Sequence, residues 1–179
     1  MAWTAPMTFV DGSVLTAEQL NIFLRDNLNE TSPAKATTKG SLFVGNGPNS
    51  IVERIPQRAI ITAADDTTST SYTDMATVGP SVTVTTGTRA LIVISAHIAN
   101  NTSNSLSSIS YTISGNTVQA ATDTNSLFVD GIDADKPTQR MQIQYEEGLS
   151  PGENTFTLKY KVGSGRITAQ NRFLAVWPF

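Results

Sequence analysis

Residues 3–28 read WTAPMTFVDGSVLTAEQLNIFLRDNL, and this stretch carries the strongest local structural signal in the chain. Thr16 stands where a helix N-cap belongs and Gln19 follows three residues later, which is the spacing of a capping box. Pro33 limits how far a helix can continue. The pattern predicts a helix of about three turns that begins after Thr16. Its apolar residues recur at helical spacing and form one stripe: Leu20, Phe23, Leu24 and Leu28.

A helix of this length is marginal on its own because helix nucleation is costly, so the stripe requires a partner surface. Two partners fit the pattern: the rest of the same chain, or another subunit, which includes a further copy of this chain. The apolar residues upstream are distant in sequence from the later strands, which favours a subunit interface. The residues expected at this docking or oligomer interface are Trp3, Phe9, Leu20, Phe23, Leu24 and Leu28.

The composition favours a β-rich protein with polar turns. Only 15% of the 179 residues are charged, and the net charge is −3 at pH 7. No basic block is present, so a nucleic-acid partner is not expected. The absence of cysteine excludes disulfides and cysteine-ligated metals. No apolar run approaches the roughly 20 residues of a membrane span, and the first residues lack the features of a signal peptide. We therefore expect no membrane insertion, and synthesis in a cytoplasm without export by that signal.

The chain is expected to have three parts. Residues 1–39 form a docking segment with one helix and a polar linker, and residues 40–58 form a β-hairpin around a Gly-Asn-Gly-Pro turn. Residues 59–179 form an antiparallel, jelly-roll-like β-sandwich, because strand-like runs recur there at roughly 8–12-residue spacing. The fold class is mainly β. The predicted strands are residues 59–63, 72–78, 81–86, 89–100, 107–114, 117–122, 126–129, 139–147, 154–162, 166–169 and 172–176.

Several predicted strands alternate apolar and polar residues, which is typical of strands with one buried face. Three strands are expected to place such an apolar row in the core. The rows are Ile109, Tyr111 and Ile113; Met141, Ile143 and Tyr145; and Phe156, Leu158, Tyr160 and Val162.

The usual catalytic patterns are missing from the sequence. His97 is the single histidine, and no nucleophile-elbow motif or phosphate-binding loop accompanies it. We therefore expect no enzyme, no cofactor and no metal. Asp65 and Asp66 are expected in a solvated loop. The best metal candidate is an acidic stretch that could ligate calcium, but it does not match an EF-hand, and a plain acidic loop is the favoured interpretation. Its members are Asp123, Asp130, Asp133 and Asp135.

Two long irregular segments, residues 100–107 and 123–137, interrupt the strand pattern. Long loops on a rigid β scaffold are where binding sites usually occur. The residues expected to face a ligand there are Asn101, Asn104, Asp130, Asp133 and Asp135.

The opening stretch resembles the N-termini of small virion proteins of tailed phages, often called minor tail or tail-fibre proteins. Their pattern W-x-x-P…F…G…V…T-A…L-N…L-R-D-N is matched here by Trp3, Pro6, Phe9, Gly12, Val14, Thr16, Ala17, Leu20, Asn21, Leu24, Arg25, Asp26 and Asn27. Residues 40–56, GSLFVGNGPNSIVERIP, are similar to a hairpin repeat of phage fibres, through Gly40, Leu42, Val44, Gly45, Gly47, Arg54, Ile55 and Pro56. The resemblance covers about the first third of the chain.

This resemblance implies a non-enzymatic virion protein that assembles in the host cytoplasm. It implies a homotrimer whose N-termini dock on other virion proteins while the β-domains face outward. A capsid decoration or head-fibre protein is the alternative, with the same parts docked on a capsid. A less favoured alternative is a carbohydrate-binding module that binds a host surface glycan through exposed aromatic residues such as Tyr72, Tyr111, Tyr145 and the Trp177–Phe179 tip.

Overall fold

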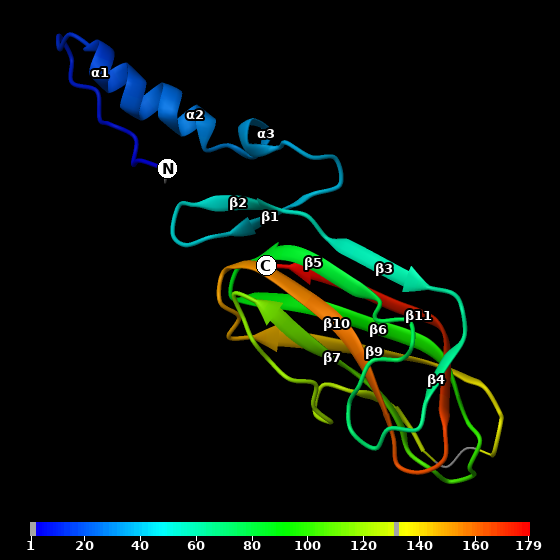
Figure 1. Cartoon of the computed structure of the whole chain (residues 1–179). Coiled ribbons are helices and arrows are strands. Elements are labelled where there is room, and N and C mark those ends of the chain that lie inside the picture. The colour runs from blue at the N-terminus through cyan, green and yellow to red at the C-terminus, as the bar shows by residue number, and fades with distance from the viewer. Residues whose placement is uncertain (1–2, 131–132) are drawn as a thin grey trace. The chain divides into compact units, whose positions relative to one another are not determined.

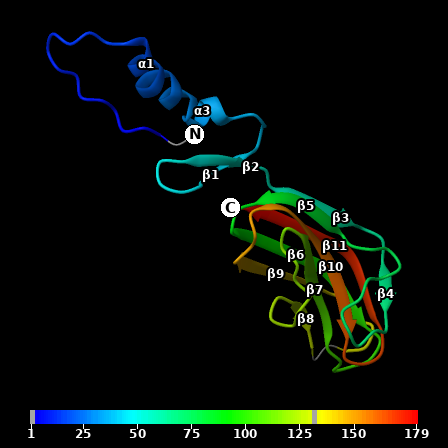
Figure 2. The same cartoon turned by 60° about the vertical axis from the view of Figure 1, so that its left-hand side comes forward.

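The chain folds into two compact units, Met1–Ile55 and Pro56–Phe179. The structure is a computed structural model that describes residues 3–130 and 133–179 (Figures 1 and 2). The predicted hairpin belongs to the first unit, because hydrogen bonds tie its strands and turn to the segment that precedes it. The second unit is the predicted β-sandwich.

The predicted N-terminal helix is confirmed. Thr16 caps it: the Thr16 hydroxyl accepts from the Gln19 N–H, and the Gln19 side chain accepts from the Thr16 N–H. The linker was expected to be irregular, but it contains a further helical turn that begins around Pro33, where a missing N–H costs no helical hydrogen bond. No helix among the described residues is long and apolar enough to cross a membrane. The elements of this unit are α1 (Ala17–Leu20), the π-helical η1 (Asn21–Asp26), α2 (Asn27–Asn29), α3 (Ser32–Lys35), β1 (Leu42–Gly45) and β2 (Ile51–Arg54), with β1 and β2 antiparallel.

The sandwich has two antiparallel sheets. One has the order β3-β11-β6-β9, with β4 paired to β11, and the other has the order β5-β10-β7-β8. Counted along the chain without β4, the eight strands lie in the orders 1-8-3-6 and 2-7-4-5. This is the strand arrangement of a jelly roll, so the predicted fold class is confirmed. The strands are β3 (Gln57–Ile61), β4 (Asp65–Thr67), β5 (Ser81–Thr86), β6 (Arg89–Asn100), β7 (Ser107–Gly115), β8 (Leu127–Val129), β9 (Thr138–Glu147), β10 (Gly152–Val162) and β11 (Ile167–Pro178).

The core lies between the two sheets and is formed by alternate residues of the long strands. The apolar rows expected on β7 and β10 are buried there, as is every second residue of β6. Fully buried apolar side chains from both sheets include Ile92, Ile94, Ile98, Ile109, Tyr111, Ile113, Phe156, Leu158, Tyr160, Ile167 and Leu174.

Some strand predictions are wrong. Residues 72–78 and 117–122 each make one isolated bridge, through Thr73 and Gln119, instead of forming a strand. Residues 65–67, expected in a solvated loop, form β4. The two strands predicted after residue 165 are one strand, β11, with a register shift between Gln170 and Phe173. A bulge of this kind changes which face the following residues occupy, and it turns Arg172 into the core.

The apolar row predicted for the core on β9 faces the opposite way. Met141, Ile143 and Tyr145 are 63%, 55% and 47% exposed, whereas Glu146 is buried. The register with β6 explains this, because Glu146 pairs with Ala90, which points into the core. The buried carboxylate accepts a hydrogen bond from the hydroxyl of Tyr111 on the other sheet at 2.5 Å. It also accepts one at 3.2 Å from Asn125, so its burial is compensated.

Candidate functional site

One polar side chain holds the N-terminal lead-in against the helix. Asn27 is 4% exposed and is the single buried residue among the described residues of the first unit. Its Oδ1 accepts from the Thr4 N–H at 2.8 Å, and its Nδ2 donates to the Thr4 carbonyl at 2.9 Å. Nδ2 also lies 3.1 Å from the Phe23 carbonyl, to which it donates. The lead-in therefore runs antiparallel to the helix, as the blue trace in Figure 1 shows.

A tight turn lets the lead-in reverse before the helix begins. Gly12 has a φ of 77°, which glycine adopts without the steric penalty of a Cβ atom. Both the N–H and the hydroxyl of Ser13 donate to the Val10 carbonyl, at 3.1 and 2.7 Å. Two hydrogen bonds to the Val10 carbonyl thus close the turn that leads to the Thr16 cap.

Hydrogen bonds also tie the hairpin to the preceding segment. The Trp3 N–H donates to the Asn49 carbonyl at 2.8 Å, and the Lys35 ammonium donates to the Ile51 carbonyl at 3.1 Å. The Glu53 carboxylate on β2 accepts from the linker through Ser41, Thr37 and the Thr38 N–H. These hydrogen bonds favour the ionised carboxylate and lower the pKa of Glu53 to about 2.

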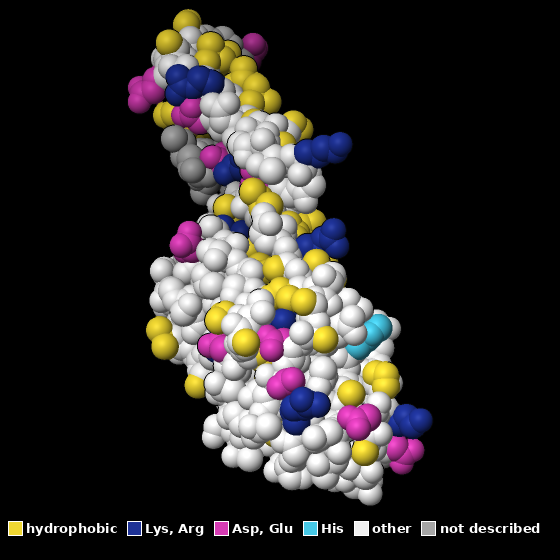
Figure 3. Space-filling model, turned by 45° about the vertical axis from the view of Figure 1, so that its right-hand side comes forward, with side chains coloured by type: hydrophobic (Ala, Val, Ile, Leu, Met, Phe, Trp, Pro, Cys, Tyr) yellow, Lys and Arg dark blue, Asp and Glu magenta, His cyan; other side chains and the backbone are white. Residues whose placement is uncertain are grey.

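The lead-in and the helix enclose an apolar groove of about 240 Å³. It is lined by Pro6, Met7, Phe9, Leu15, Gln19, Leu20, Phe23 and Leu24, so it brings together most of the predicted interface residues. Phe9 is 68% exposed and Leu24 is 55% exposed. Leu28, further along the helix, is also exposed. Figure 3 shows hydrophobic side chains gathered along this helix, in contrast to the mostly white face of the sandwich in the same view.

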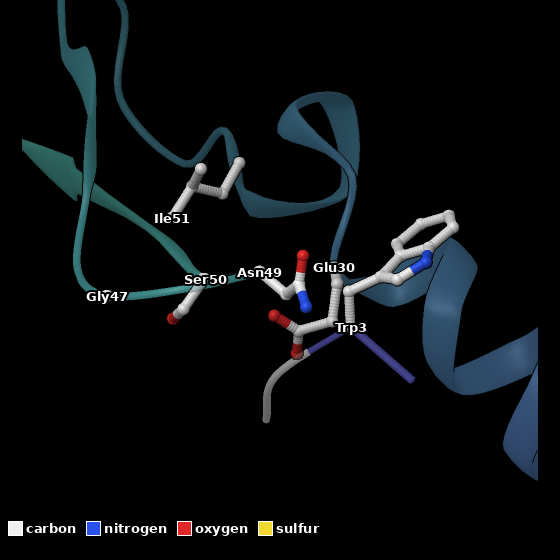
Figure 4. A pocket seen from close by; sticks show the side chains of 6 residues that line it. All are labelled: Trp3, Glu30, Gly47, Asn49, Ser50 and Ile51. Atoms are coloured by element: carbon white, nitrogen blue, oxygen red, sulfur yellow. The ribbon is translucent and has the colours of Figure 1, made fainter. Parts of the chain in front are cut away.

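Trp3 lies outside this groove. It lines a separate, open hollow of about 490 Å³ together with Glu30, Gly47, Asn49, Ser50 and Ile51 (Figure 4). The indole is directed away from Ile51 in that view, and the Glu30 carboxylate pairs with Lys35 at 2.7 Å. The structure therefore separates Trp3 from the other residues of the predicted interface.

The structure brings the two predicted ligand-facing loops together. The Ala134 N–H donates to the Ser103 hydroxyl at 3.0 Å, and the Asp135 N–H donates to the Asn100 carbonyl at 2.7 Å. The residues expected to face a ligand are exposed, and they are Asn101, Asn104, Asp130, Asp133 and Asp135. Residues 131 and 132, within the second loop, lie outside the described residues.

Asp123 does not join the other acidic residues of the proposed metal candidate. Its carboxylate pairs with the Lys161 ammonium at 2.5 Å and accepts from the Tyr72 hydroxyl at 2.8 Å. The pKa of Asp123 is lowered, and the hydrogen bond from Lys161 is the largest cause. Within the part of the chain that the structure describes, no group of three or more His, Cys, Asp or Glu side chains could hold a metal ion.

Two features of these surfaces were not found from the sequence. Asn27 matches the phage-like pattern, but a polar residue between Leu24 and Leu28 gives no local signal of its hydrogen bonds to Thr4. The outward-facing apolar row of β9 carries no sequence signal of its orientation, because alternation alone does not say which face of a strand is buried.

The sequence matches no protein-family model and no curated protein. Among solved structures the chain is similar to Eiger TNF from S. frugiperda, at 10% identity over 70% of this chain and 92% of that chain, with a TM-score of 0.49. It is also similar to the infectious bursal disease virus VP2 subviral particle, at 14% identity and a TM-score of 0.43, over 74% of this chain but only 36% of that chain. A third similarity is to the CBM22-1 xylan-binding domain from Paenibacillus barcinonensis Xyn10C, at 11% identity over 80% of this chain and 90% of that chain, with a TM-score of 0.33. These values concern the fold alone.

We predict that Asn27→Ala releases the lead-in while the sandwich stays intact. The substitution removes three hydrogen bonds, each of which contributes about 0.5–1.5 kcal/mol. Limited proteolysis should therefore cleave near Val10–Ser13 about 10-fold faster or more. Asn29→Ala, at the exposed end of the helix, is the matched control. Equal cleavage rates in the wild type and Asn27→Ala would contradict the assigned role.

The Glu53 hydrogen bonds predict a pH dependence of the first unit. The folded pKa of about 2 lies below the ordinary glutamate pKa of 4.5, so these bonds stabilise the linker fully above pH 4.5. Their contribution declines below that pH and disappears as the pH falls through about 2. The amide NMR shifts of Thr37 and Thr38 should titrate with an apparent pKa near 2 and lose this titration in Glu53→Gln. A midpoint near 4.5 would show that the carboxylate does not hold the linker.

Proposed function

We propose that this chain is a non-enzymatic virion structural protein of a tailed phage, of the minor tail or tail-fibre type. It docks through its N-terminal unit and displays the jelly roll outward. One observation carries the proposal: the N-terminal unit is held by hydrogen bonds around Asn27, and its large apolar side chains remain exposed. The exposed side chains include Phe9, Val10, Leu20, Leu24 and Leu28. The resemblance of residues 3–27 to phage virion N-termini supports the same function.

The energetics of this surface favour a docked state. Burying apolar surface contributes roughly 25 cal/mol per Å², and the groove is already shaped by the lead-in. Losses of rotational freedom and side-chain entropy reduce the gain. The Asn27 bonds reduce that loss because they hold the lead-in beside the helix before binding. We therefore assign the groove and the helical stripe to contact with another virion protein.

The proposal includes a homotrimer that assembles in the host cytoplasm and resides in the virion. Capsid decoration is the alternative location, since the same docking unit could bind a capsid protein. Labelling of intact particles with an antibody to the sandwich distinguishes a tail from a capsid location. Binding to a host surface glycan is the weaker alternative.

The tyrosines named for glycan binding do not form a common exposed set. Tyr111 is fully buried. Tyr72 is half-buried, and its hydroxyl is engaged by Ser108 and Asp123. Tyr145 is exposed, but it lies on the other sheet, on β9. Tyr145 lies near the Trp177–Phe179 tip, since its ring is 6.3 Å from the Phe179 ring, but Tyr72 and Tyr111 do not join it in one exposed aromatic face.

We predict that Leu24→Asp prevents incorporation into phage particles because it places a carboxylate in the apolar groove. The variant should remain folded in the sandwich, with an unchanged thermal unfolding transition for that unit. Ile22→Asp is the matched control, since it adds the same charge to the same helix at a residue that does not line the groove. Incorporation is measured by quantitative immunoblotting of purified particles from a complemented deletion strain.

Wild-type incorporation of Leu24→Asp would refute docking through this groove. Equal loss of incorporation in Ile22→Asp would show that the helix, and not the groove, is the element recognised.

A further inference from the structure

An open hollow of about 450 Å³, here called the Lys159 pocket, lies on the outward face of the β5-β10-β7-β8 sheet. Thr112 on β7 and Lys159 on β10 form its floor, since the residues on either side of each point into the core. Its walls belong to the two segments that were predicted as strands and make one bridge each. Residues 72–74 form one wall, and Ala120 and Ala121 form the other.

Backbone hydrogen bonds fix both walls of the Lys159 pocket. Thr73 and Tyr160 exchange N–H···O bonds of 3.0 and 2.9 Å, which attach the first wall to β10. Gln119 and Ile113 exchange bonds of 3.0 and 2.9 Å, which attach the second wall to β7. The pocket therefore has its shape before a ligand binds, and a preformed shape reduces the entropy lost on binding.

The Tyr72 ring closes one end of the Lys159 pocket. Its hydroxyl lies 2.7 Å from the Ser108 hydroxyl and donates to the Asp123 carboxylate at 2.8 Å. The Lys161 ammonium lies 4.9 Å from the ring centroid. Because Lys161 pairs with Ser108, the ring lies over the row of the sheet that adjoins Lys159. Tyr72 is thus held in place while its side chain contributes to the lining.

The two charges in the lining cancel. The Lys159 ammonium donates to both oxygens of Asp74 at 2.7 Å. An ammonium has three donors and a carboxylate about four acceptor sites, so this ion pair can still donate and accept. Paired in this way, Lys159 attracts an anion weakly and Asp74 attracts a cation weakly. The polar part of the pocket therefore favours a neutral ligand whose groups both donate and accept, as hydroxyls do.

The rest of the lining is apolar and consists of the Tyr72 ring and the methyl groups of Ala120 and Ala121. A pyranose ring matches this division, because its edge carries hydroxyls while its faces carry C–H groups that pack on aromatic rings and methyls. The volume lies within the range of about 300–1,000 Å³ that is usual for small-molecule sites. The pocket thus offers both kinds of surface that a sugar unit presents.

We propose that the Lys159 pocket binds one unit of a neutral saccharide. The Asp74 carboxylate accepts from ligand hydroxyls, the Lys159 ammonium donates to a ligand oxygen, and a face of the sugar ring packs on Tyr72. The site lies in the jelly roll and not in the docking unit, so it goes beyond the proposed docking function and does not depend on it. It uses a single tyrosine and needs no aromatic surface shared with Tyr145.

The test titrates the isotope-labelled full-length protein with uncharged methyl glycosides of the common hexoses and N-acetylhexosamines. We expect at least one glycoside to shift the NMR signals of Tyr72, Thr112 and Lys159. Asp74→Asn removes the charged acceptor and should weaken that binding about 10-fold or more. Asp66→Asn is the matched control, because Asp66 is also ion-paired, with Arg166, but lies outside the pocket.

Inorganic phosphate is the second probe, and it tests the charge argument. The wild type should show no phosphate-induced shifts in the pocket, because Lys159 is already paired with Asp74. Asp74→Asn frees the ammonium and should gain such shifts. Phosphate binding by the wild type would identify an anion site and overturn the proposal.

Thr112→Val is the second variant, since it removes a hydroxyl from the floor and leaves the ion pair of the wall in place. It should also weaken glycoside binding, and unchanged amide signals of the core strands show that each variant is folded. Trisaccharides of the sugar that binds distinguish the source of the ligand. An affinity equal to that of the methyl glycoside indicates a free or terminal unit, and a higher affinity indicates an extended chain.

Two further outcomes overturn the proposal. One is the absence of shifts in the Lys159 pocket with every glycoside. The other is glycoside binding that is unchanged in both Asp74→Asn and Thr112→Val. Incorporation of the Leu24→Asp variant into particles is measured separately, so docking can fail while the saccharide site stands, and the reverse.

Discussion

The pairing of β6 with β9 constrains the whole sandwich, because it determines what faces the core and what faces outward. Glu146 sits opposite Ala90, so the polar residues of β9 share the side of the buried β6 row. The Tyr111 hydroxyl on the other sheet donates a hydrogen bond to the Glu146 carboxylate, and this bond compensates the burial of the carboxylate. Burial of the Tyr111 ring raises the pKa of its hydroxyl, so it remains a donor over the physiological range. The apolar row of β9 is left on the surface as a result.

The N-terminal unit depends on a different principle. Its geometry comes from polar side chains, chiefly those of Asn27 and Glu53, that form hydrogen bonds with backbone groups distant in the sequence. Hydrogen bonds of this kind orient a segment but contribute little net stability in water. The unit therefore presents its apolar residues on a groove and a stripe instead of burying them. Such a segment gains most of its stability when a partner covers it.

Elements with a local sequence signal were predicted correctly. The predictions were wrong or missing where the structure depends on contacts between residues that are distant in sequence. The Thr16 capping box, the hairpin and the alternation on β7 and β10 each belong to one short segment, and each was confirmed. The orientation of β9 depends on Ala90 and Tyr111, which are distant in sequence. The single strand β11 was predicted as two because a bulge near Gln170 interrupts its alternation. The role of Asn27 depends on Thr4, more than twenty residues away.

The central claim is that the N-terminal unit lacks a core and is completed by a partner surface. Amide hydrogen exchange of the isolated full-length protein tests it most directly, by comparing residues 17–29 with strand β6. Since local opening free energies range from near zero up to the global value, the account predicts that the helix exchanges at least about 100-fold faster than the strand. Protection of the helix equal to that of β6 would show that its apolar stripe is already covered in the free protein, and would contradict the account.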